Sequence, residues 1–171
     1  RPVDLDQVVP AGGASSFRER SPKHRAYFFR REIDRWAEQR KAPVMAGYPA
    51  HHYNPTTLCN GVLIAGVTQG QNVDQLAHAM LQTHWREDAD LADPAALARI
   101  AEGVGVTPEP LLDAALSDEV QAIYQANTDE AMERSVFGSP TYFVDGDMFY
   151  GQDHLAQVER ALRQPYAGDW P

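Results

Sequence analysis

The sequence is poor in cysteine: Cys59 is the only one among 171 residues. A single cysteine excludes an internal disulfide and a C-x-x-C redox pair. Cys59 lies in an apolar stretch, where a free cysteine is most often a small buried hydrophobic residue. The scarcity of cysteine, together with the lack of a signal-peptide pattern, predicts a cytoplasmic protein.

Long apolar runs and basic charge are also scarce. The longest apolar run, residues 61–67, is far too short to cross a bilayer. Lysine and arginine number 15 against 24 acidic residues, which gives a net charge of −9. We therefore expect neither nucleic acid nor a membrane as a partner, although local arginines can still hold a small acidic ligand. The sequence also lacks a phosphate-binding loop and a dinucleotide-binding glycine pattern.

The middle of the chain is rich in helix signals. Ser21-Pro22 places a capping side chain before a proline at the first helical position. This helix is expected to end at Lys41, with an apolar face directed to a core: Ala26, Phe29, Ile33, Trp36 and Ala37. Further helices are expected to start near Thr56, Asn72, Asp93, Thr107 and Ser117. Asn72 with Gln75 resembles a capping box, and Leu81 falls on the apolar face that follows.

Residues 136–155 predict a hairpin followed by a helix. Residues 142–144 suit a half-buried strand, 148–150 its partner, and Asp145-Gly146 is a strong hairpin-turn signal. The helix is expected from Gln152, with these residues on one face: Leu155, Val158, Ala161 and Leu162. Pro140 stands directly before the first strand, and the Ser139–Pro140 bond is expected to be cis. This arrangement leaves the backbone of Ser139 free to pair with an extended ligand.

The C-terminal pattern closely resembles a known family. It reads V-F-G-x-P-T-x-F-V-x-G-x-x-F-x-G-x-D-x-L. It is similar to the end of the 2-hydroxychromene-2-carboxylate isomerases and of their relatives, the kappa-class glutathione transferases. The likeness extends to RPVDL at the start, DRWA in the first helix, HWREDADLAD in the middle and ANTDEA before the hairpin. It implies a DsbA-like thioredoxin fold with an all-α insertion domain, an α/β protein.

The resemblance also implies a division of the chain. Residues 1–16 and 136–171 would form the thioredoxin-like domain, and residues 17–135 the helical insertion domain. Residues 2–5 look like the tail of a strand, and residues 10–16 like a loop of small residues. In the resembled family a further strand and helix precede this point and carry the serine that activates the glutathione thiol. We therefore expect no catalytic residue within this chain and a family serine upstream of Arg1.

At the hairpin, the resemblance implies a glutathione site. Its residues would be Ser139, Pro140, Tyr150, Gly151, Gln152 and Asp153. The Ser139 backbone would pair with the cysteinyl part of glutathione, and Asp153 would bind the γ-glutamyl ammonium. Nearby amides would hold the carboxylate. From the residues alone, a structural turn at Ser139-Pro140 and a helix cap at Gln152-Asp153 remain open interpretations.

An acidic aromatic substrate would meet residues elsewhere in the chain. By likeness, Arg20 would hold the substrate carboxylate, because a planar guanidinium suits that group; a solvated charged face is the alternative. His52 and Tyr53 lie in a turn-rich loop and are candidates to line the substrate pocket. His51 and His52 together suggest a metal, but no third ligand has convincing spacing, so no metal site is predicted.

The function implied by the resemblance is a glutathione-dependent cis-trans isomerase of 2-hydroxychromene-2-carboxylate-like acids in aromatic-hydrocarbon catabolism. Glutathione would be its cofactor, a small aromatic acid its substrate, and a homodimer its assembly. Two alternatives stay open: a kappa-like glutathione transferase, which would consume glutathione, and a non-catalytic thioredoxin-fold protein that binds glutathione or a partner.

Overall fold

The computed structural model describes residues 1–15 and 19–168, without the side chain of Phe29. In chain order its helices are α1 (Leu5–Ala11), α2 (Pro22–Ala26), a π-helix (Tyr27–Glu32), α3 (Ile33–Arg40), α4 (Thr57–Thr68), α5 (Asp74–Glu87), α6 (Pro94–Gly103), α7 (Glu109–Ala115) and α8 (Asp118–Glu133). The hairpin strands β1 (Thr141–Val144) and β2 (Asp147–Tyr150) follow, then a 3₁₀ turn, η3 (Gln152–His154), and α9 (Leu155–Arg163). No helix in the described part of the chain is long and apolar enough to cross a bilayer.

Helices α4 to α8 form a helical layer that holds the larger core. Its largest fully buried side chains are Leu76, Met80, Leu97 and Leu111. Glycine permits close packing here, because a Cβ on Gly61 would lie 2.2 Å from the Ala115 carbonyl oxygen. Each buried aliphatic side chain stabilises the fold by roughly 1.5–3 kcal/mol before conformational entropy is counted. The layer is therefore the most strongly packed part of the described molecule.

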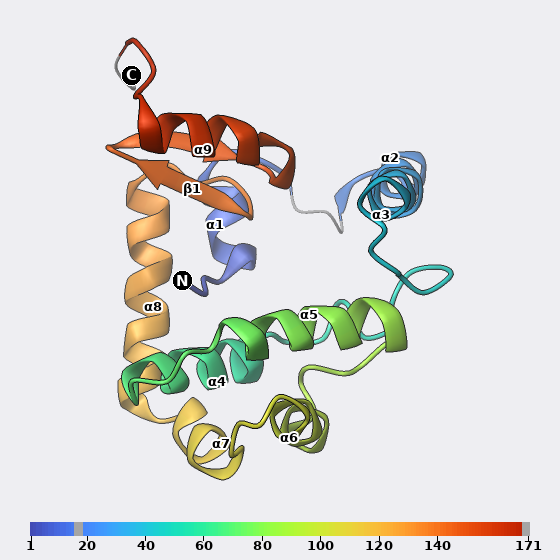
Figure 1. Ribbon diagram of the computed structural model, residues 1–171, viewed down its shortest axis with the longest axis vertical. Helices are drawn as coiled ribbons and strands as arrows, with labels where there is room; N and C mark the ends of the chain where they lie inside the picture. Colours follow the sequence, from blue (N-terminus) through green and yellow to red (C-terminus); the bar gives the residue numbers. More distant parts are fainter. Residues whose placement is uncertain (16–18, 169–171) are drawn as a thin grey trace.

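The long helix α8 joins this layer to the hairpin, and α9 lies across the hairpin (Figure 1). A smaller core forms around Val8 of α1, Ala131 of α8 and Val136, with Phe143 of β1 packed against it. The first helix, α1, and the hairpin strand β1 thus pack together at this end of α8.

The hairpin confirms the sequence prediction. Thr141 pairs with Tyr150 and Val144 with Asp147 in an antiparallel register. Asp145 and Gly146 both have positive φ angles, 50° and 91°, as a two-residue hairpin turn requires. The Ser139–Pro140 bond is cis, also as predicted.

The first residues correct two predictions. Residues 2–5 are not the tail of a strand, because the chain enters α1 at Leu5. Asp4 caps this helix by accepting a hydrogen bond from the Asp6 amide at 2.9 Å. Pro10 lies in the last turn of α1 rather than in a loop. Ser16, the end of the predicted loop, lies outside the described residues.

Residues 22–40, named here the helical arm, form where expected but do not face a core as predicted. The Ser21 hydroxyl accepts a hydrogen bond from the His24 amide at 3.2 Å, and the arm ends before Lys41 in a left-handed conformation. However, Ala26 is exposed and none of the arm's described side chains is buried: Ile33, Trp36 and Ala37 are only half-buried. Phe29, also predicted for this face, lies outside the described side chains. The predicted face therefore has no core to join among the described residues.

Three smaller predictions also fail. Asn72 accepts from the Asp74 amide at 2.9 Å, so it forms a turn before α5 rather than a capping box. Leu81 is 59% exposed and Leu162 72% exposed, although both were placed on apolar faces. The reason is the same for both leucines: a stripe at helical spacing is wider than the surface that the neighbouring elements cover.

Candidate functional site

The predicted glutathione residues come together at one end of the hairpin. The Gly151 amide donates to the Pro140 carbonyl oxygen at 2.9 Å, which joins the segment before β1 to the segment after β2. Gly151 has a φ of 103°, and a Cβ there would lie 2.5 Å from Asp153 Oδ1. Glycine is needed at this position because side chains rarely adopt that backbone conformation. We name Ser139, Pro140 and residues 150–153 the hairpin corner.

The polar groups of the hairpin corner include unpaired backbone. Among the described residues, neither the N–H nor the C=O of Ser139 has a hydrogen-bond partner. Ser139 is exposed, so these groups face outward. An extended ligand with its own amide groups fits such a segment by pairing along it.

Asp153 lies in η3, two residues after Gly151, whose amide bonds to the Pro140 carbonyl oxygen. Neither η3 nor α9 has a side-chain capping hydrogen bond, although Asp153 lies in the first turn of η3. The Asp153 side chain is 51% exposed, and its Oδ1 lies 3.5 Å from His154 Nδ1. His154 Nδ1 is also 2.6 Å from the Tyr150 carbonyl oxygen. The Asp153 carboxylate is thus partly open to solvent.

Arg40 also reaches the hairpin corner, which sequence reasoning missed. Its Nη2 donates to the Gln152 carbonyl oxygen at 2.9 Å, and its guanidinium lies 4.9 Å from the centre of the Trp36 ring. This contact joins the end of the helical arm to η3. No local pattern signals it, because the two residues are 112 positions apart.

A groove of about 380 Å³ adjoins the corner between α8 and β1. Ser139 and Pro140 line its end, and Arg134 and Phe143 line its side. The Arg134 guanidinium lies 3.6 Å from the centre of the Phe143 ring, and its Nη1 lies 3.2 Å from Glu130 Oε1. The i,i+4 spacing of Glu130 and Arg134 could have predicted their ion pair, but not the ring contact.

The predicted substrate residues lie on other elements. Arg20 precedes α2, where its Nη1 is 3.5 Å from His24 Nε2 and its guanidinium 5.9 Å from the Phe28 ring centre. His52 and Tyr53 lie in the loop before α4, which packs on the C-terminal end of α5. The structure therefore divides the candidates between the hairpin corner, the start of the arm and this loop.

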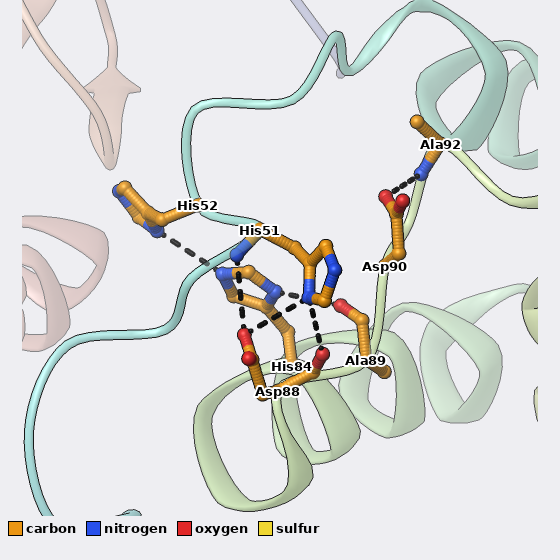
Figure 2. A network of polar contacts seen from close by, with 7 residues as sticks. All are labelled: His51, His52, His84, Asp88, Ala89, Asp90 and Ala92. Atoms are coloured by element: carbon orange, nitrogen blue, oxygen red, sulfur yellow. Dashed lines mark hydrogen bonds and ion pairs between the residues drawn. The ribbon is translucent and has the colours of Figure 1, made fainter.

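Figure 2 shows the polar network that holds the loop. The His51 amide donates to Asp88 Oδ1 at 3.2 Å, and His51 Nδ1 lies 2.9 Å from the Asp88 carbonyl oxygen. His52 Nδ1 lies 3.1 Å from His84 Nε2, and His84 Nδ1 lies 2.9 Å from the Ala89 carbonyl oxygen. The loop's two histidines are thus both fixed to the end of α5.

Local environment shifts the pKa values of several groups here. Burial, and next the charge of His84, lowers the pKa of His52 to about 4. Hydrogen bonds to the Asp88 backbone and side chain raise the pKa of His51. Burial raises the pKa of the Cys59 thiol to about 11, and Cys59 is only 5% exposed. Cys59 therefore stays a thiol at neutral pH, which confirms it as a buried core residue.

The described residues contain no cluster of potential metal ligands. No group of three or more histidine, cysteine, aspartate or glutamate side chains is arranged to hold an ion there. The rings around His52 are aromatic instead, with Tyr48 at 4.7 Å and Trp85 at 5.1 Å between ring centres. The loop site is suited to hydrogen bonding and aromatic contact.

The chain is similar in sequence to a known domain family and to isomerases of one name. The family model of the DSBA-like thioredoxin domain matches residues 1–163. The 2-hydroxychromene-2-carboxylate isomerase of Sphingobium xenophagum is 29% identical over 164 residues, which cover 95% of this chain and 80% of that protein. The isomerase of the same name from Pseudomonas sp. strain C18 is 29% identical, with 94% of this chain and 73% of that protein covered.

A solved structure of an isomerase with the same name is also similar to this chain. The selenomethionine form of a 2-hydroxychromene-2-carboxylate isomerase superimposes with a TM-score of 0.73 at 25% sequence identity. The match covers 95% of this chain and 77% of that one. The predicted α/β thioredoxin-like fold with a helical insertion is therefore confirmed.

Proposed function

The chain belongs to the DSBA-like thioredoxin domain family, and from that premise we propose that it is an isomerase of 2-hydroxychromene-2-carboxylate-like aromatic acids, with glutathione as its cofactor. The similarity to isomerases of that name supports the reaction class. The observation that supports the cofactor is the unpaired backbone of Ser139 at the hairpin corner, where the Gly151 amide bonds to the Pro140 carbonyl oxygen two residues before Asp153.

The hairpin corner fits glutathione group by group. The Ser139 N–H would donate to, and its C=O accept from, the cysteinyl amide groups. Asp153 would accept from the γ-glutamyl ammonium, a charge-assisted contact worth about 1.5–3 kcal/mol. Tyr150 packs on Phe137 with ring centres 4.9 Å apart, which fixes one wall of the corner. Bound glutathione would supply the thiol for reversible addition to the substrate.

The substrate would be held by residues outside the corner. Arg20 would pair with the substrate carboxylate, and His52 and Tyr53 would hydrogen-bond its oxygen atoms. We place the protein in the cytoplasm as a homodimer engaged in the breakdown of aromatic hydrocarbons. These assignments follow the proposed reaction.

The test is an isomerisation assay with a hydroxychromene carboxylate, run on a protein that includes the expected upstream serine, with and without glutathione, and followed by absorbance. We expect turnover only with glutathione, and no loss of glutathione at completion. Loss of one glutathione per substrate would identify a transferase instead. Turnover that ignores glutathione would contradict the proposed cofactor.

Binding is tested separately by calorimetry. Asp153→Ala should weaken glutathione binding by about 10- to 100-fold, since a charge-assisted hydrogen bond is lost. Asp113→Ala is the matched control, because Asp113 is an exposed aspartate on α7. Equal affinities of the two variants would remove Asp153 from the site.

A further inference from the structure

A buried histidine stands behind His52 in the loop network. His84 is only 7% exposed, lies in the last turn of α5 and makes a polar contact with each ring nitrogen. Its Nδ1 faces the Ala89 carbonyl oxygen and its Nε2 faces His52 Nδ1. Figure 2 shows the three groups in sequence, with His84 between Ala89 and His52. A buried polar side chain with both nitrogens engaged is held in one orientation.

These contacts determine where the ring protons lie. A carbonyl oxygen only accepts, so His84 Nδ1 must carry a proton. In a neutral His84 the other nitrogen, Nε2, is then an acceptor. His52 Nδ1 must therefore carry the proton that it donates to His84. It follows that the lone pair of a neutral His52 is on Nε2.

We propose that His84 is a positioning residue that holds His52 as the Nδ1–H tautomer, so that His52 Nε2 acts as general base toward the hydroxyl of the aromatic-acid substrate. This inference rests on the proposed function. It gives His52 a specific role in the reaction. It also explains why a polar side chain, His84, is buried in α5. The arrangement orients a base through its second nitrogen, the same use of a hydrogen bond that fixes histidine in other acid–base sites.

The proton transfer balances within the pair. The substrate O–H bond breaks as an N–H bond forms at His52 Nε2. The Nδ1–H bond of His52 then breaks as an N–H bond forms at His84 Nε2, which leaves His84 as imidazolium and His52 neutral. The reverse sequence returns the proton to an oxygen of the product. No other reactant is needed.

His84 lies in the last turn of α5, at the negative end of the helix dipole. The titratable groups around the pair are Tyr48, His51 and Tyr53 from the loop, and Asp88 and Asp90 after α5. The interaction with His84 is one of the causes that lower the pKa of Asp90, after its hydrogen bonds to Asn54 and to the Ala92 amide. The pKa of His52, about 4, keeps its ring neutral at neutral pH.

Nitrogen-15 NMR of the histidine rings tests the tautomers without any substrate. At neutral pH we expect His52 and His84 both as Nδ1–H, with a scalar coupling across the N–H···N hydrogen bond. His84→Gln keeps an acceptor for His52, so His52 should remain Nδ1–H in that variant. His84→Phe removes the acceptor, and His52 should move toward the Nε2–H form that free histidine prefers. A wild-type His52 that is mainly Nε2–H would overturn the proposal.

Kinetics test the role of the pair in the reaction. His52→Ala should lower kcat by about 10²- to 10⁴-fold, the usual range for a lost general base, and added imidazole should restore part of it. His84→Gln cannot take up the proton, so kcat should fall while KM changes little and the acid limb of the pH profile moves. His78→Gln is the matched control, because His78 is exposed on the same helix. A His84→Gln enzyme with the pH profile of the control would refute the relay.

The two proposals fail in different ways. If the wild-type protein shows no glutathione-dependent isomerisation, the proposed function is wrong, and NMR still decides whether the pair exists. If wild-type turnover is normal but His52→Ala and His84→Gln are unaffected, the proposed function stands and the further inference is wrong.

Discussion

Ser117 and Ser21 cap their helices in the same way, yet the two helices have different surroundings. The Ser117 hydroxyl accepts from the Val120 amide at 3.3 Å, and the Ser21 hydroxyl from the His24 amide at 3.2 Å. Helix α8 then buries Val120 and Tyr124 in the helical layer, whereas no described side chain of the arm is buried. A cap depends on neighbours in sequence, but burial depends on what other elements supply. The two regions should therefore respond differently to equivalent substitutions.

The largest expected effect is in the layer. Leu111 is fully buried and Leu116, five positions on, is 59% exposed. Leu111→Ala should lower the free energy of unfolding by about 2–5 kcal/mol, because it leaves a cavity as well as removing buried area. Leu116→Ala should change it by no more than about 0.5 kcal/mol. Urea denaturation measures both, and similar losses would mean that the layer is not the packed region described here.

A second substitution tests the hairpin corner. A Cβ on Gly138 would lie 2.5 Å from the Tyr150 ring. Gly138→Ala should therefore displace that ring, lower the free energy of unfolding by about 1–3 kcal/mol and weaken glutathione binding. Gly103→Ala is the control, because nothing lies within 4 Å of a Cβ there and Gly103 is helical. If Gly138→Ala leaves glutathione affinity unchanged, the Tyr150 ring is not part of the binding site.

Caps and turns were the features most readily predicted from the sequence. Ser21, Asp93 and Ser117 cap helices as expected, and Asp145-Gly146 forms the hairpin turn. Each of these depends on interactions within a few residues, which a single sequence contains. Asp4 was missed although it follows the same rule, because the apolar residues around it were interpreted as a strand.

Burial and long-range contacts were predicted less well. The arm's apolar stripe resembles that of α6, but only α6 meets other helices that cover it. Arg40 at η3 and His84 behind His52 join elements that are far apart in the sequence, 112 and 32 positions. No spacing rule connects such pairs. The hairpin corner was predicted because its residues lie at the two ends of one short hairpin, and the resemblance named them.

The caps at Ser117 and Ser21 should contribute differently to the stability of the whole molecule. Ser117→Ala should lower the global free energy of unfolding by about 1 kcal/mol, the usual cost of a lost cap. Ser21→Ala should lower it by clearly less, because no described side chain of the arm is buried. Its effect should appear instead as faster amide hydrogen exchange confined to the arm. Equal global losses for both variants would show that the arm unfolds together with the layer.

The smallest expected effect is on the pH dependence of stability through His52. Its pKa falls from 6.5 to about 4 on folding, chiefly because burial disfavours the charged ring. Between these two values the unfolded chain binds more protons than the folded chain, so stability falls as pH falls from about 6.5 to about 4. His52→Gln should flatten this dependence by under about 1 kcal/mol, because His52 is only half-buried and solvent screens the effect. His51 has a raised pKa, so its contribution is present below pH 6.5 and is lost at higher pH, outside this window. Urea denaturation at several pH values, with His78→Gln as control, measures the slope. A slope that His52→Gln leaves unchanged would mean that the loop does not bury His52 against α5 in solution.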